Sequence, residues 1–252
     1  GPGLPAGLVT DTGRSFLGGL DLNKNLVPMC RLVCLLILPG LLGGCGDGGK
    51  EQVFNPERPS ARAVETLNVV EHQKAGEDGW DKTEHGSMMV SRDQVRTGVD
   101  SKAILLFIDD NRTTLGPESL MVIKKITGKK TEHAVDLFDT VVKVTVGLAL
   151  FEVKEGEGSR SFVVETPYAV IVHRGTTFLV DVAEDGSARV VVKDGHVEVR
   201  ALDRQVTVGP SQTTIVRKDS PPTEPEIVNL VREPGFSLNR RQLPTLERRS
   251  GF

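Results

Sequence analysis

Cysteine thiols occur only near the N-terminus of this sequence. The three cysteines are Cys30, Cys34 and Cys45, all within the first fifth of the 252 residues. A basic residue, Arg31, precedes an apolar run from Leu32 to Leu42, and small residues then lead to Cys45. This layout is typical of a secretory signal peptide, and the run is shorter than the roughly 20 apolar residues that span a bilayer. Because the rest of the chain has no cysteine, it holds neither a disulfide nor a cysteine-ligated metal.

The residues Leu42, Gly43, Gly44 and Cys45 resemble the lipobox of bacterial lipoproteins. The resemblance implies that diacylglycerol is attached to the Cys45 thiol, that a signal peptide over residues 29–44 is removed, and that the new N-terminus is acylated. Two or three acyl chains anchor a protein stably, whereas one holds it only marginally. The alternative is a buried apolar helix, which the glycines beside Cys45 disfavour. We therefore expect an extracytoplasmic lipoprotein on the periplasmic side of the inner or outer membrane.

The other residues suited to chemistry do not form a catalytic pattern. No two histidines stand at HExxH spacing, and the chain has no G-x-S-x-G elbow. His173 alternates with Ile171 and Ala169, so we predict an edge or half-buried side chain rather than a base. The oxygens of Asp109-Asp110-Asn111 could hold Ca²⁺, but Asp and Asn are typical turn residues, and we favour a plain turn. We predict no enzyme, no catalytic residue, no metal site and no cofactor.

The composition narrows the class of partner. The formal net charge is −3, which offers no basic excess to neutralise nucleic-acid phosphates. One tryptophan and one tyrosine give little surface for stacking against bases or sugars. We therefore expect no nucleic-acid partner and no stacking surface for bases or sugars.

Short β-type runs separated by turn residues fill the middle of the chain, from Val64 to Val216. Asp194-Gly195 and Glu184-Asp185-Gly186-Ser187 lie between alternating apolar runs. Asp-Gly supplies the positive φ angles of a tight hairpin. Only Glu132 to Asp139 suggests a short helical turn. The pattern predicts an all-β domain over residues 64–216, a sandwich or solenoid-like stack of short antiparallel strands.

The flanking segments lack such patterns. We interpret residues 1–28 as an upstream or non-native extension and residues 45–63 as a flexible tether that holds the domain off the membrane. Residues 217–252 contain five prolines and a cluster of arginines near the end. We predict a disordered tail there. The arginines could contact an acidic surface, but a solvated tail is the favoured interpretation.

Residues 66–216 resemble the FecR domain. The resemblance is carried by four segments, namely Asp93-Gln94-Val95-Arg96-Thr97-Gly98, Pro117-x-Ser119-Leu120, Thr166-Pro167-x-Ala169-x-x-Val172-x-Arg174-Gly175-Thr176-x-Phe178-x-Val180 and Lys193-Asp194-Gly195-His196-Val197-Glu198-Val199. Structural roles explain the family motif Arg174, Gly175, Thr176 and Phe178 without catalysis. Gly175 would let the backbone bend, Phe178 would fill the core, Thr176 would bond a turn, and Arg174 would pair with an acid or cap an edge.

The resemblance implies a role in envelope signalling. FecR-type proteins relay a signal, such as the arrival of an iron–siderophore complex, from an outer-membrane receptor to a sigma factor. This sequence has a lipobox in place of their cytoplasmic segment and spanning helix, which puts direct sigma-factor control in doubt. We favour a sensory or adaptor domain that binds a protein partner, which could add a strand to an exposed edge of the domain's sheet. The alternatives are a structural envelope protein that binds peptidoglycan or polysaccharide, and the sigma-factor relay itself.

Overall fold

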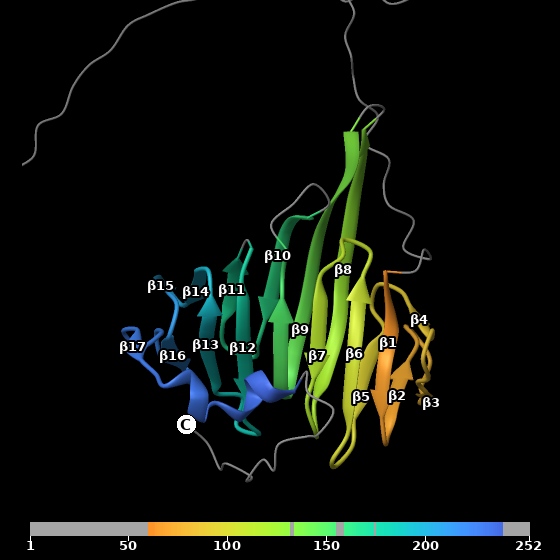
Figure 1. The fold of residues 1–252 in the computed structure, drawn as a ribbon, viewed down its shortest axis with the longest axis horizontal. Coiled ribbons are helices and arrows are strands. Elements are labelled where there is room, and N and C mark those ends of the chain that lie inside the picture. Colours follow the sequence, from red (N-terminus) through yellow and green to blue (C-terminus); the bar gives the residue numbers. More distant parts are fainter. Residues whose placement is uncertain (1–59, 132–133, 155–158, 174, 239–252) are drawn as a thin grey trace, which may run out of the picture. The chain divides into compact units, whose positions relative to one another are not determined.

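The computed structural model describes residues 60–131, 134–154, 159–173 and 175–238 (Figure 1). The strands up to the middle of the chain are β1 (Ala61–Leu67), β2 (Val70–Gln73), β3 (Asp81–Lys82), β4 (Met88–Met89), β5 (Gln94–Thr97), β6 (Lys102–Phe107), β7 (Arg112–Leu115) and β8 (Leu120–Thr131). The later strands are β9 (Ala134–Glu152), β10 (Ser159–Glu165), β11 (Val170–His173), β12 (Thr177–Val182), β13 (Ala188–Asp194), β14 (Val197–Ala201), β15 (Arg204–Val208), β16 (Gln212–Val216) and β17 (Glu226–Ile227). Two 3-10 helices follow, η1 (Leu230–Arg232) and η2 (Pro234–Ser237).

The strands form two sheets that share β9. Sheet A has the order β4-β1-β6-β7-β9-β12-β13-β16-β17. Sheet B has the order β3-β2-β5-β8-β9-β10-β11-β14-β15. The pairing of β9 with β10 is parallel, and the others named here are antiparallel. The predicted all-β fold is confirmed.

One hydrophobic core fills the space between the two sheets. Alternate residues of each strand point inward, as strand geometry requires, and most of them are Val, Ala, Leu or Phe. Aromatic rings form its centre: Phe162 of sheet B lies 5.5 Å from Phe107 and 5.8 Å from Phe151 of sheet A, measured between ring centroids. Burying each such side chain contributes about 1.5–3 kcal/mol. The core therefore joins the two sheets into one unit.

Strand β9 passes from one sheet to the other at Gly147. Residues up to Val146 pair in sheet B, and residues from Gly147 pair in sheet A. Gly147 has φ +92°, and a Cβ atom there would lie 2.4 Å from Ser119 Oγ and 2.5 Å from Ser119 Cα. Ser119 Oγ accepts a hydrogen bond from Leu148 N at 2.9 Å. Only glycine satisfies both the positive φ and the close approach.

The predicted helical turn over residues 132–139 was wrong. Residues 132 and 133 lie outside the described part, and the rest of the segment begins β9, which pairs with β8 from Ala134 onward. A long ladder supplies the backbone hydrogen bonds of this segment, so tertiary pairing overrides a weak local preference.

The prediction of a disordered tail from residue 217 was wrong for residues 217–238. Residues 226–238, which we call the strap, comprise β17, η1 and η2 and lie against sheet A (Figure 1). Sequence reasoning weighed the prolines and missed the apolar residues between them. Residues 239–252 lie outside the described part.

The segments assigned to targeting are not described. The extension over 1–28, the signal peptide over 29–44, the lipobox with Cys45, and the tether up to residue 59 all lie outside the described residues. Among the described residues, no helix has the length and apolar character needed to span a membrane.

Candidate functional site

The family motif lies where the chain passes from sheet B to sheet A. Arg174 lies outside the described residues, and Gly175, with φ +55°, turns the chain from β11 into β12. The buried Thr176 donates its hydroxyl to the backbone oxygen of His196 at 3.1 Å. Its own carbonyl accepts a hydrogen bond from Val153 N at 3.0 Å. The motif thus ties three segments of the chain together.

A second crossing packs on the first. Between β13 and β14 the chain returns from sheet A to sheet B at Gly195, which has φ +79°. A Cβ atom at Gly195 would lie 2.7 Å from the carbonyl oxygen of Gly175 and 3.1 Å from Thr176 Cα. The two crossings touch through backbone atoms, which makes Gly195 a steric requirement. This region positions strands and presents little side-chain surface to a ligand.

His173 lies in the core beside this crossing. Its side chain is 3% exposed, and its ring centroid lies 4.5 Å from that of Phe178 and 5.3 Å from that of Phe162. Neither ring nitrogen has a hydrogen-bond partner. Burial lowers the pKa of His173 to about 3, so the ring is neutral at physiological pH. The prediction of an edge or half-buried position was wrong, although the apolar neighbours at alternate positions were a signal for full burial.

The acidic segment after β6 forms a turn that is tied to β9. Asp109 is buried, and its carboxylate accepts hydrogen bonds from Thr140 Oγ1 at 2.7 Å and from Asn111 N at 3.3 Å. Burial raises the pKa of Asp109. Asn111 Oδ1 accepts from Lys154 N at 3.1 Å. In the described ranges, no three His, Cys, Asp or Glu side chains gather as a metal site. The oxygens of this turn are used to join strands.

The longest edge strand of either sheet is β15, which has a neighbour on one side only. The other edge strands, β3, β4 and β17, have two residues each, whereas β15 has five. Ala201 pairs with Arg204 across a two-residue turn, and the register continues through Glu198 opposite Thr207. In an antiparallel hairpin of this kind, alternate residues point their N–H and C=O groups away from the partner. Those residues here are Gln205 and Thr207.

The open side of β15 is accessible to a ligand. Gln205 and Thr207 are both exposed, and no backbone hydrogen bond from the described residues reaches their outer side. Near the start of the strand, Arg204 pairs with Glu224. Within the part of the chain that the structure describes, the rest of the edge carries no proline, bulge or covering element, which are the usual protections against added strands. We therefore regard this edge as the candidate interaction site.

Comparison with known proteins identifies the central part of the chain. The FecR protein family model matches residues 93–198. Two crystal structures of a protein from Parabacteroides distasonis, provisionally described as an anti-sigma factor, are similar at 20% sequence identity, with TM-scores of 0.41 and 0.43. Each match covers 54% of this chain and 60% of the other. No curated protein matches the chain. The match to the FecR family thus spans residues 93–198, from the residue before β5 to the second residue of β14.

Proposed function

We propose that this chain is a non-enzymatic adaptor of envelope signalling, whose β domain binds a protein partner by accepting a strand at the edge of β15, just beyond the residues that match the FecR family. The FecR match supports a signalling or regulatory role. The observation that carries the finer proposal is the open edge, where five residues pair on one side only. An extended partner segment would continue sheet B there.

The edge offers both affinity and selectivity. The N–H and C=O groups of Gln205 and Thr207 supply up to four main-chain hydrogen bonds, each with a net contribution of about 0.5–1.5 kcal/mol. The next strand inward carries the ion pair between Arg200 and Glu198, with Nη2 and Oε2 2.5 Å apart. Alternate side chains of an added strand would lie beside Gln205 and Thr207, with these charges one strand further away, which gives the site a preference among sequences.

The proposed location is the extracytoplasmic face of a bacterial membrane. It rests on the match of Leu42-Gly43-Gly44-Cys45 to a lipobox. Acyl chains on Cys45 would hold the chain at the bilayer, and a tether over residues 45–59 would leave the β domain free to meet envelope proteins. The predicted end of the tether at residue 63 was wrong, because residues 61–63 belong to β1 and Ala61 and Ala63 are buried.

A proline substitution separates edge binding from folding. Thr207→Pro removes one outward N–H and leaves the β14–β15 ladder intact, because Thr207 does not donate to β14. Thr207→Val keeps the N–H and serves as the matched control. Full-length tagged chains are purified from detergent-solubilised envelopes, and the co-purifying proteins are quantified by mass spectrometry.

The expected result is a specific protein that co-purifies with the parent chain and with Thr207→Val. Its yield falls at least tenfold with Thr207→Pro, which corresponds to about 1.4 kcal/mol. Circular dichroism and thermal unfolding establish that all three chains are folded. Equal recovery by Thr207→Pro and Thr207→Val would reject the edge as the binding site.

A further inference from the structure

The outer face of sheet A carries an apolar patch that points away from the core. Leu148 and Leu150 of β9, Leu179 of β12 and Val191 of β13 alternate with core residues, so they lie on the opposite face. Leu150 pairs with Leu179, and Leu179 with Val191, in one cross-strand row. All four are at most 6% exposed. We call these four residues the docking face.

The strap covers the docking face. Leu238 is fully buried against it, and Leu230 and Phe236 pack on it while half-buried. Gly235 lies so close to Leu179 that a Cβ atom there would be 2.5 Å from both methyl carbons. Leu238, at the end of the strap, lies beside Gly116, the residue that follows β7. Its Cδ2 atom is 3.4 Å from the position that a Cβ atom on Gly116 would take. The strap therefore crosses the strands of sheet A from β16 toward β7.

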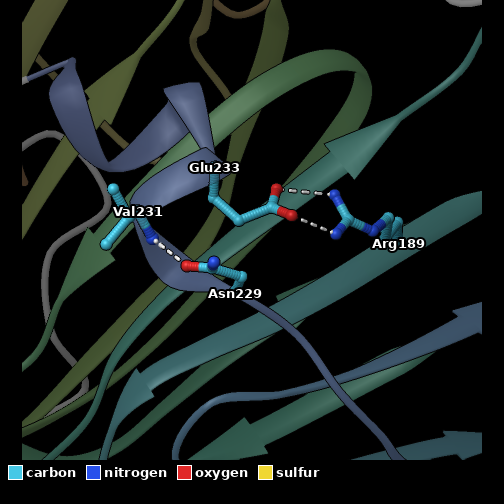
Figure 2. Close-up of polar contacts among 4 residues, drawn as sticks. All are labelled: Arg189, Asn229, Val231 and Glu233. Carbon is cyan, nitrogen blue, oxygen red and sulfur yellow. Dashed lines mark hydrogen bonds and ion pairs between the residues drawn. The ribbon is translucent and has the colours of Figure 1, made fainter.

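A single ion pair fixes the middle of the strap. The Glu233 carboxylate accepts two hydrogen bonds from the Arg189 guanidinium, at 2.8 Å from Nη1 and 2.6 Å from Nη2 (Figure 2). The two side chains are only 11% and 10% exposed. The Glu233 hydrogen bond raises the pKa of Arg189. A bidentate pair of this kind recognises a carboxylate at one defined position.

Backbone hydrogen bonds join the strap to the sheet only at its start, as far as the described residues show. Residues Glu226 and Ile227 pair with β16, and Val228 N donates to Ser211 O at 2.8 Å. From residue 229 onward the strap's backbone bonds are internal, for example Val231 N to the side chain of Asn229 (Figure 2). Val231 is 95% exposed. A segment held by a few side chains opens at a lower free energy than a strand in a ladder.

We propose that the docking face is a second protein-binding site, which takes an apolar segment with one central carboxylate, and that the strap occupies it until a partner segment of the same pattern displaces it. The strap itself defines the ligand: apolar side chains on both sides of an acid that pairs with Arg189. Release of residues 229–238 leaves the ladders of sheet A intact, since none of them includes these residues. This site is independent of the edge at β15.

The test uses a fluorescent synthetic peptide of residues 226–238 and the full chain. In the double variant Glu233→Gln, Phe236→Ala the strap loses its carboxylate and one apolar contact, while the docking face is unchanged. Fluorescence anisotropy should show that this variant binds the peptide at least tenfold more tightly than the parent chain, because the competing strap is weakened. Adding Arg189→Gln should remove most of that gain.

Three outcomes would overturn the proposal. The first is the same peptide affinity in the parent chain and in the double variant. The second is a scrambled peptide that binds the double variant as tightly as the native sequence does. The third is a peptide affinity that does not change when Arg189→Gln is added to the double variant. Hydrogen exchange of the parent chain gives a second readout, in which strap amides should exchange at least 100-fold faster than amides of β12. Thr207→Pro should leave peptide affinity within twofold of the parent value, which keeps this test separate from that of the proposed function.

Discussion

Replacing His173 by leucine should remove much of the acid sensitivity of this domain. The histidine ring is 3% exposed, lies against Phe162 and Phe178, and has no hydrogen-bond partner for either nitrogen. Leucine has a similar volume and no group to protonate. The cost of folding a charged ring into this site therefore disappears in the variant.

The sign and size of the effect follow from the two pKa values of His173. Burial lowers the pKa from 6.5 to about 3 in the folded state. Above about pH 7.5 neither state is appreciably protonated; as the pH falls through 6.5, the unfolded chain binds a proton that the folded chain excludes, so stability is lost progressively down to about pH 3. Between about pH 7.5 and about pH 5, the linkage relation gives a loss of about 2 kcal/mol from this one residue.

Urea unfolding at these two pH values measures the effect. The parent chain should lose about 2 kcal/mol more stability between them than His173→Leu does. His196→Leu is the matched control, because His196 is exposed, and it should retain the acid sensitivity of the parent. An equal loss in the parent and in His173→Leu would refute the assignment of a neutral, buried histidine.

Four further substitutions test the fold and the anchor. Gly147→Ala should destabilise the chain by about 2–5 kcal/mol in urea unfolding, because it combines a positive φ with overlap against Ser119; an unchanged midpoint would contradict the crossing of β9. Phe178→Ala should cost about 3–5 kcal/mol by the same assay, and Phe236→Ala, on the half-buried strap, clearly less; similar costs would contradict the central position of Phe178. Cys45→Ser should abolish incorporation of labelled palmitate and release the chain from the membrane fraction; continued labelling would exclude Cys45 as the lipid site.

Local signals predicted one of the two Asp-Gly hairpins. Asp185-Gly186 turns β12 into its partner β13, with Gly186 at φ +82°. The hairpin predicted at Asp194-Gly195 was wrong: Gly195 has the expected positive φ, +79°, but it joins β13 of sheet A to β14 of sheet B. Phe178 and Val180 share one strand face in the sequence pattern and are fully buried. Such features depend on neighbours in the chain, so they are readable without a structure.

Features that depend on distant segments were missed. The start of β9 follows from its pairing with β8, and the strap is ordered because Arg189 and Leu179 lie under it. Neither contact leaves a local pattern. The open side of β15 could not be predicted from the sequence either, because a sequence pattern predicts a strand but not which of its two sides lacks a partner strand.

In-cell photocrosslinking from Gln205 tests the central claim of edge recognition most directly. A photoreactive residue at Gln205 would lie against any strand added to β15, whereas one at Glu84, in an exposed turn, would not. We expect a discrete adduct with one envelope protein from position 205, absent from position 84 and reduced at least tenfold by Thr207→Pro. No adduct at position 205, or the same adducts from both positions, would contradict this claim.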